Sequence, residues 1–199
     1  MYISTFAFKK IKLLDNMDNL HKLVMQMFKE NRSAENVLYA IMDSQSRNVN
    51  IIVQSDNKPE NIPNELTLLN SKECNSLFDK VHTGTILRIY GIVEPTKRDR
   101  RMEQSRNSRC IIKSLHERHD WLKRKFQPAG NLIAINEVGK NPVFVKKKTG
   151  DEHKTSFFRY ECLLYVRDPD KLKELLRSGI GRSKAYGAGL FLILTTYQP

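Results

Sequence analysis

Apolar and polar residues alternate, or recur at helical spacing, along most of the first half of the chain. Residues 2–9 alternate and predict a strand. The polar segment 15–19 then precedes a predicted amphipathic helix that ends near Lys29. The apolar positions of this helix follow the i, i+3, i+4, i+7, i+8 pattern: Leu20, Leu23, Val24, Met27 and Phe28.

Further strands are predicted before the middle of the chain. Residues 36–43 and 49–55 form a predicted strand pair joined by the polar turn 44–48. Residues 85–93 form another strand, which ends just before a proline. Residues 56–83 have no clear periodicity, so no element is assigned to them.

The second half of the chain alternates strands with helices in the same way. The pattern predicts, in order, a strand at 109–113, a helix at 116–126, a strand at 132–138, a hairpin at 143–166 and a final strand at 190–196.

A further helix precedes the final strand and has clear start and stop signals. Asp168 can cap its N-terminus, and Pro169 suits the first helical position. Gly179 fits the left-handed position after the last turn. The predicted buried face consists of Leu172, Leu175 and Leu176.

This order of elements indicates the fold class. The second unit has the order βαββαβ, which is that of a ferredoxin-like domain. The first unit repeats the order with its second helix degenerate. We therefore predict an α+β protein of two tandem ferredoxin-like domains, at residues 1–94 and 108–199, joined by a basic connector at 95–107.

The distribution of charge points to a polyanionic partner. The net formal charge is +12 and the pI is about 9.7. Residues 1–96 hold eleven Lys/Arg and eleven Asp/Glu, whereas residues 97–199 hold twenty-three against eleven. A one-sided excess favours nucleic acid, because each phosphate contact releases condensed counterions. Solubility alone would not confine the excess to one half of the chain.

The cysteines and the N-terminus favour a reducing compartment. Cys74, Cys110 and Cys162 are odd in number and too widely spaced for a disulfide framework or a zinc knuckle. The first lysines follow an alternating strand, unlike the charged start of a secretory signal. No stretch approaches the ~20 apolar residues of a membrane span. We expect a cytoplasmic protein.

A glycine-rich loop lies between the last predicted helix and the last strand. Residues 179–189 contain four glycines together with Arg182 and Lys184. Such glycines permit close backbone approach, and their N–H groups can form an anion-binding concavity. The order of residues excludes a Walker A loop. The alternative is a flexible turn, but a simple turn needs fewer glycines and no pair of cations.

This loop, G-I-G-R-S-K-A-Y-G-A-G-L-F, resembles the signature of repeat-associated CRISPR RNA endonucleases. Other segments resemble, along essentially the whole chain, the CasE family of the type I-E Cascade complex. These segments are Met1–Ser4, Leu20–Leu23, Met27–Phe28, Val53–Ser55, Pro95–Lys97 and Trp121–Lys125.

The resemblance implies two tandem ferredoxin-like domains and an endoribonuclease that cuts the CRISPR repeat of precursor crRNA. It implies metal-independent attack of a ribose 2′-hydroxyl at the 3′ base of the repeat hairpin, giving a cyclic phosphate and a 5′-hydroxyl. The enzyme is then expected to retain the crRNA within Cascade. No cofactor is expected, and the isolated protein is expected to be a monomer.

The resemblance implies that His21 is the catalytic residue, which places the reaction in the first domain. Imidazole titrates near neutrality and can exchange protons with the 2′-hydroxyl or the leaving oxygen. The neighbouring Lys22 can stabilise developing charge. The chain departs from the family at Asp18, where a tyrosine is common, and at Glu94, where asparagine is common. From position alone, His21 is more typical of a half-buried structural histidine, and the family resemblance reverses that interpretation.

Three segments are expected to bind RNA, and the hairpin resembles the family element that docks in the major groove of the stem, where recognition depends largely on phosphates and shape. The connector supplies Lys97, Arg98, Arg100, Arg101 and Arg106. The hairpin supplies Lys146, Lys147, Lys148 and Lys154, with Arg159 on its returning strand. The glycine-rich loop supplies Gly181, Arg182, Lys184, Gly187 and Gly189.

The remaining histidines lack the spacing with cysteine or carboxylate that a metal site needs, so no metal is expected. They are His82, His116, His119 and His153. Two alternatives to the enzyme stay open. One is a non-catalytic RNA-binding protein on the same scaffold, and the other is a scaffold subunit whose basic half meets an acidic protein.

Overall fold

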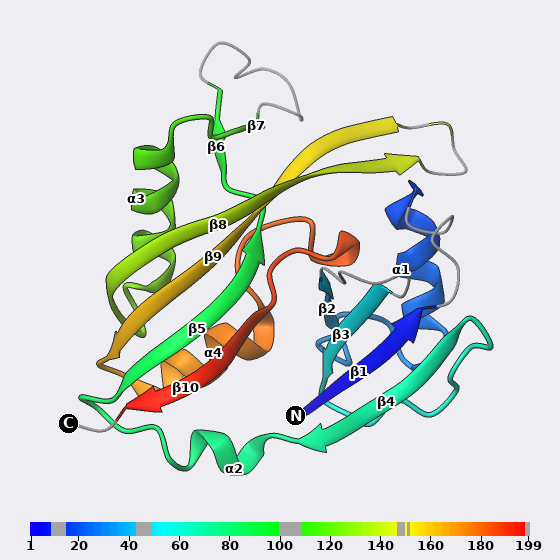
Figure 1. Ribbon diagram of the computed structural model, residues 1–199, viewed down its shortest axis with the longest axis horizontal. Helices are drawn as coiled ribbons and strands as arrows, with labels where there is room; N and C mark the ends of the chain where they lie inside the picture. Colours follow the sequence, from blue (N-terminus) through cyan, green and yellow to red (C-terminus); the bar gives the residue numbers. More distant parts are fainter. Residues whose placement is uncertain (9–14, 43–48, 100–108, 147–149, 151, 198–199) are drawn as a thin grey trace.

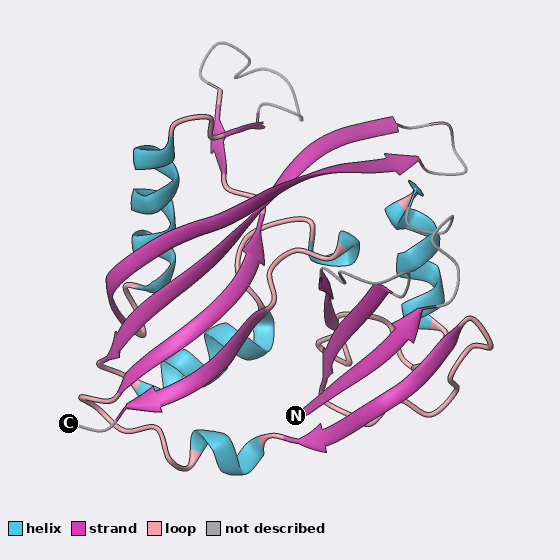
Figure 2. Cartoon of the chain, in the orientation of Figure 1, coloured by secondary structure: helices cyan, strands magenta, loops and turns pink. Residues whose placement is uncertain are grey.

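Two four-stranded antiparallel sheets lie side by side and form the framework of the fold (Figures 1 and 2). The structure is a computed structural model that describes residues 1–8, 15–42, 49–99, 109–146, 150 and 152–197. Within this part, no helix is long and apolar enough to cross a membrane.

The first sheet has the strand order β2-β3-β1-β4. Its strands are β1 (Tyr2–Phe8), β2 (Leu38–Met42), β3 (Val49–Ser55) and β4 (Leu66–Glu73). Helix α1 (Met17–Met25) follows β1, and no helix separates β3 from β4 among the described residues. This arrangement is a ferredoxin-like unit without its second helix, as the sequence predicts. The fourth strand, β4, lies in the stretch to which the sequence analysis assigned no element.

The second sheet has the order β10-β5-β9-β8. Its strands are β5 (Ile86–Val93), β8 (Gly130–Lys146), β9 (Glu152–Val166) and β10 (Phe191–Tyr197). The helices α3 (Leu115–Phe126) and α4 (Pro169–Ser178) complete the βαββαβ order. The separately predicted strand 132–138 is the first part of the long strand β8, which continues through two register shifts into the hairpin.

The predicted boundary between the domains is wrong for two strands. We expected residues 85–93 in the first unit, but β5 pairs with β9 and β10 in the second sheet. The predicted first strand of the second unit, β7 (Arg109–Ile111), pairs instead with β6 (Thr96–Arg98). The β6–β7 pair therefore occupies part of the predicted connector. Sequence periodicity identifies a strand but not its partner, because pairing is decided by tertiary contacts.

Side-chain caps begin the three longer helices. Asn16 accepts from the N–H of Asp18 at α1, Ser114 from Glu117 at α3, and Asp168 from Lys171 at α4. Each cap satisfies an N–H group that the helix itself leaves without a partner. Pro169 occupies the first turn of α4, as predicted. A single short helix, α2 (Asn75–Phe78), follows β4.

The two units are joined by apolar packing and by the β8–β9 hairpin. A shared cluster contains Leu38 and Ala40 from β2 together with Ile92 and Phe157 from the second sheet. The hairpin extends beyond its own sheet toward α1 (Figure 1). Its residue Val145 is only 2% exposed and belongs to the hydrophobic core of the first unit. The hairpin is therefore anchored on both units.

The glycine-rich loop lies at the junction of the units. Gly179, with φ of 76°, has Leu38 of β2 so close that a Cβ would lie 2.7 Å from its methyl carbons. Gly187, with φ of 93°, faces Met17 and Tyr39, each 3.3 Å from where a Cβ would be. Positive φ and close approach both favour glycine. These two glycines therefore serve the packing of the two units against each other.

Candidate functional site

His21 lies on α1 at the point where the helix meets the glycine-rich loop. Leu20 and Val24 are fully buried on the same helix and fix its apolar face, while His21 at its flank is half-buried. The His21 ring meets the ring of Tyr186 edge-on, with 6.3 Å between centroids and an interplanar angle of 73°. The predicted catalytic histidine is thus held by packing next to the loop.

The surroundings of His21, chiefly its burial, favour the neutral imidazole. Burial lowers the pKa of His21 from 6.5; Asp18 acts to raise it, and the cations Arg32 and Lys22 lower it further. Within the described residues, Nδ1 is buried and has no hydrogen-bond partner. A neutral ring retains a nitrogen lone pair that can accept a proton at neutral pH.

Asp18, the first of the two departures from the family pattern, interacts with another residue of α1. Its carboxylate forms an ion pair with Lys22, one turn along the helix. Asp18 is only 8% exposed, whereas the Lys22 side chain is 47% exposed. Asp18 therefore neutralises a neighbouring cation on the helix and, within the described part of the chain, is the carboxylate that raises the His21 pKa.

Tyr186 is positioned by a short 3₁₀ helix, η3 (Lys184–Tyr186), within the glycine-rich loop. The preceding residue, Ser183, adopts a left-handed conformation with φ of 55°, and its hydroxyl donates to Glu94 Oε2 at 2.5 Å. Glu94, which is 5% exposed, also accepts a hydrogen bond from Thr155 of β9. This second departure from the family pattern thus ties the loop to the hairpin strand.

The hairpin is fastened directly to the start of α1. Asn16 Nδ2 donates to the Lys146 carbonyl at 2.8 Å, and the Lys146 N–H donates to Asn16 Oδ1 at 2.9 Å. Lys146 itself pairs with Glu152 at 2.7 Å across the hairpin. The described part of the basic hairpin therefore lies beside the helix that carries His21, although Lys147 and Lys148 fall outside the described residues.

Two further hairpin cations have different surroundings. Lys154 is exposed, and its Nζ lies 5.9 Å from the centroid of the Phe144 ring. Arg159 is only 7% exposed, and burial lowers the pKa of its guanidinium. Lys154 can therefore bind a phosphate at the surface, whereas Arg159 can contact only a group that enters the cavity it lines.

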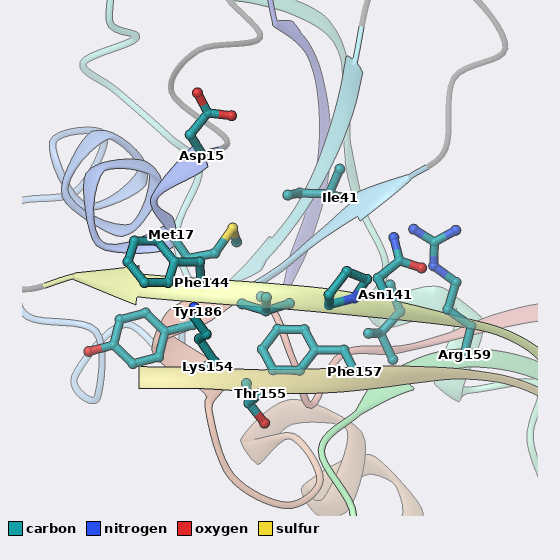
Figure 3. A pocket seen from close by; sticks show the side chains of 14 residues that line it. Asp15, Met17, Ile41, Asn141, Phe144, Lys154, Thr155, Phe157, Arg159 and Tyr186 are labelled. Carbon is teal, nitrogen blue, oxygen red and sulfur yellow. The ribbon is translucent and has the colours of Figure 1, made fainter. Parts of the chain in front are cut away.

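A cavity of about 560 Å³ opens between the two units beside Tyr186 (Figure 3). Its wall combines residues of α1, β2, β5, the loop and the hairpin. Phe157 lies near the middle, Phe144 and Tyr186 lie toward one end, and Asn141 and Arg159 lie toward the other. The further lining residues are Asp15, Met17, Ile41, Ile92, Pro142, Val143, Lys154, Thr155 and Gly187.

The connector cations are only partly described. Lys97 of β6 pairs with Glu117 of α3, with Nζ–Oε distances of 3.0 and 2.7 Å. Arg98 is exposed at the end of β6. Arg100, Arg101 and Arg106 fall outside the described residues. The β6–β7 pair lies along the same edge of the molecule as the hairpin in Figure 1.

The glycine-rich loop is less open to an anion than the sequence suggests. The N–H groups of Gly179, Ile180, Tyr186, Ala188 and Gly189 all donate to backbone carbonyls. Lys184 Nζ donates to the Ser178 carbonyl at 2.7 Å, which closes the end of α4, and burial lowers the pKa of its ammonium group. Gly181 is partly exposed and Arg182 is exposed beside it.

No described group of three or more His, Cys, Asp and Glu residues could hold a metal ion. His82 and His116 are exposed, and His116 lies 3.4 Å from Asp120 on the same helix. His119 is half-buried against the ring of Tyr160, 6.1 Å between centroids. The side chain of His153 falls outside the described part. Among the histidines whose side chains are described, His21 is the one that meets the glycine-rich loop at the junction.

Several residues at the junction were not singled out from the sequence. Tyr186 and Tyr39 were missed because an aromatic side chain in a loop or strand is most often part of a core. Asn16 lay in a polar segment identified only as a helix start, and Asn141 lay at the edge of a predicted hairpin. The bond from Asn16 to β8 could not be predicted, because the residue type of a helix cap does not indicate a contact with a distant strand.

Comparison with known proteins agrees with this geometry. The family described as CRISPR associated protein matches residues 1–194. Cse3 bound to a 19-nucleotide RNA superposes with a TM-score of 0.83 at 19% identity, over 96% of this chain and 98% of that one. Escherichia coli K-12 Cas6e gives 0.79 at 19% identity, over 97% and 98%.

A third structure, Thermus thermophilus Cse3 bound to an RNA that represents a pre-cleavage complex, gives a TM-score of 0.79 at 17% identity, over 98% of this chain and 100% of that one. No curated protein matches the chain by sequence. The fold and the junction define a tandem ferredoxin-like protein with a histidine-bearing helix set against a glycine-rich loop. Because the family match spans nearly the whole sequence, the chain belongs to the CRISPR-associated protein family.

Proposed function

We propose that the protein is an endoribonuclease that cleaves CRISPR repeat stem-loops in precursor crRNA. The observation that carries this proposal is the position of His21, half-buried on α1 where the helix, the loop and the basic hairpin meet. Structurally similar proteins are described as a CRISPR endoribonuclease bound to RNA and as parts of a CRISPR RNA-guided surveillance complex. We therefore propose that the product crRNA stays bound and joins this chain to other Cascade subunits.

The proposed chemistry needs no metal ion. The 2′-hydroxyl oxygen bonds to the adjacent phosphorus as its proton leaves, the P–O5′ bond breaks, and O5′ takes up a proton. Neutral His21 is suited to accept the first proton, because its lowered pKa keeps the ring unprotonated near pH 7. The resulting imidazolium can return that proton to O5′. The products are a 2′,3′-cyclic phosphate and a 5′-hydroxyl.

Cations around His21 are proposed to hold the RNA. Lys22 is about half exposed and can turn from Asp18 toward the phosphate. Lys146, Lys154 and Arg182 offer exposed charges near the junction. Lys97 and Arg98 extend this surface onto β6, and the other predicted cations of the connector and hairpin belong to the same segments. Recognition of an A-form stem depends largely on such phosphate contacts.

The test is cleavage of radiolabelled RNA that carries the CRISPR repeat of the host genome, in the presence of EDTA. Wild-type protein should cut at one site, and His21→Ala should not. A substrate with 2′-deoxyribose at the cleavage nucleotide should resist wild-type protein. His116→Ala is the matched control, because His116 is an exposed histidine on another helix and should leave the rate unchanged.

The alternative of an RNA-binding protein without catalysis is favoured by one observation. Asp18 and Lys22 pair with each other, so the cation next to His21 is partly neutralised. Tight, salt-dependent binding without cleavage by any of these proteins would establish that alternative. Equal cleavage by wild type and His21→Ala would remove His21 from the mechanism.

A further inference from the structure

We propose that the cavity between the two units, called here the junction cavity, binds one unpaired nucleobase of the RNA. The bound nucleobase belongs to one of the first two nucleotides on the 3′ side of the repeat stem. This inference rests on the proposed function for the identity of the RNA. It adds to that function a defined subsite for a single base.

The aromatic end of the cavity suits the face of a base. Phe144 and Tyr186 line this end and are both half-exposed, so their rings are accessible from within the cavity. Phe157, which is 4% exposed, forms part of the wall between the two ends. Unpaired bases bind proteins largely by stacking on such rings, whatever their sequence.

The polar end suits the edge of a base. Asn141 lies opposite Phe157 in the hairpin ladder. With the amide turned to suit its neighbours, its oxygen accepts from Arg159 Nη2 at 3.1 Å and its nitrogen donates to the Lys140 carbonyl at 3.2 Å. The Asn141 amide is partly exposed, and the second N–H of its NH₂ group can donate to a base carbonyl or ring nitrogen. An amide and a guanidinium at the end of an aromatic cavity are the groups that discriminate between bases. Figure 3 shows both side chains on the same side of Phe157.

The cavity also lies close to His21, which itself lines a separate hollow together with Arg32 and Ser33. Tyr186 lines the cavity and meets the His21 ring edge-on, so a single side chain separates the two. The exposed ammonium of Lys154 stands at the rim, where a backbone phosphate would pass. A volume of about 560 Å³ is within the usual range for small-molecule sites, about 300–1,000 Å³. The nucleotide would enter base first, with its phosphate near His21.

The experiment uses the full-length protein and repeat RNA that carries 2′-deoxyribose at the cleavage nucleotide, which blocks the reaction. 2-Aminopurine replaces each of the first two unpaired bases 3′ of the stem in turn. Stacking in the cavity should quench its fluorescence at one of the two positions. An abasic nucleotide at that position should weaken binding by roughly 5- to 150-fold, which corresponds to the contribution of stacking per base found by alanine substitution of the aromatic partner.

Protein variants then identify the cavity as the cause. Phe144→Ala and Asn141→Ala should each weaken binding of intact RNA, yet bind the abasic RNA as well as wild type does. Asn70→Ala is the matched control, because Asn70 is an exposed asparagine that lines a different cavity beside the N-terminus. It should not change binding of either RNA.

Absence of quenching at both positions overturns the proposal, and so does an abasic effect that is equally large in Phe144→Ala and wild type. These readouts report binding alone. The binding experiments therefore test the subsite independently of cleavage. The proposed cleavage is tested by the EDTA assay with His21→Ala.

Discussion

The hydroxyl of Tyr39 donates a hydrogen bond to the carbonyl oxygen of Ala185 at 2.6 Å, which joins the first sheet to the glycine-rich loop. Tyr39 is fully buried, and burial raises its pKa well above 10.0, so the hydroxyl remains a donor. Ala185 directly precedes Tyr186, whose ring meets His21. The bond therefore helps to set the loop against α1.

Tyr39→Phe should lower the free energy of unfolding by about 1–3 kcal/mol, because the Ala185 carbonyl loses its partner in a partly buried place. Urea denaturation measures the change. Tyr165→Phe is the control, since Tyr165 is 39% exposed on β9 and should change little. Equal stability of the two variants would show that the bond is not significant.

Gln54→Leu should destabilise the contact between the units by about 1–3 kcal/mol. Gln54 is 1% exposed, and its Nε2 donates to the carbonyls of Leu176 at 2.9 Å and Arg177 at 3.3 Å, at the C-terminal end of α4. These carbonyls lack partners within the helix. The change is measured as a shift of the denaturation midpoint.

Gln54→Glu tests the same contact through pH. A carboxylate facing two carbonyls would be repelled, so folding would raise the pKa of the introduced carboxyl above its unfolded value. The variant should therefore be closest to wild type below about pH 4.3, the usual pKa of a glutamate, and lose stability relative to it as the pH rises through the folded value. A deficit that does not change with pH would mean that the carboxyl escapes to solvent.

Two substitutions should move the pKa of His21 in opposite directions. Asp18→Asn should lower it further, because Asp18 is the carboxylate that raises it, and Arg32→Met should raise it, because Arg32 lowers it. Histidine ring protons followed by NMR through a pH titration give both values. The signal of His116 should not move in either variant, since His116 lies on α3.

The pH dependence of cleavage should change together with the pKa of His21. If neutral His21 accepts the proton, cleavage should fall on the acid side of its pKa, and Asp18→Asn should move that fall to lower pH. Because folding lowers this pKa, the contribution of His21 to stability is fully present above about 6.5 and is lost as the pH falls through the folded value. A pH–rate profile of the two variants measures the shift.

Arg118→Met should destabilise the second unit by about 3 kcal/mol, the lower end of the cost of removing one partner of a buried ion pair, because the Glu137 left behind is only half-buried. Arg118 is 7% exposed and binds both oxygens of Glu137, at 2.8 and 2.7 Å. Tyr160 also donates to Glu137, at 2.6 Å. Lys125→Met, on the exposed side of the same helix, is the control and should cost little.

The Arg118–Glu137 pair also predicts sensitivity to acid. Burial by itself would raise the pKa of Glu137, but the hydrogen bonds from Arg118 and Tyr160 outweigh it and hold the pKa below 4.5. The stabilisation is therefore present above about pH 4.5 and lost as the pH falls through the folded value. Acid titration should show a larger loss of stability in wild type than in Glu137→Gln, because Asp56 and other paired carboxylates contribute equally in both proteins.

The sequence by itself determined the local elements and the type of fold. The apolar stripe of α1, the Asp168 and Pro169 start of α4, and the alternation along β9 all depend on neighbours within a few residues, so their patterns are visible in the chain. The family resemblance added His21 as the candidate catalytic residue. The family match is consistent with that resemblance.

Only the tertiary structure decided which strands pair and what surrounds His21. β5 joins the second sheet rather than the first, and Tyr186 reaches His21 from 165 positions along the chain. Glu94 bonds Ser183, and Asn16 bonds Lys146, although nothing in the intervening sequence links them. Such contacts depend on how two packed units meet, and periodicity carries no information about partners so far apart in sequence.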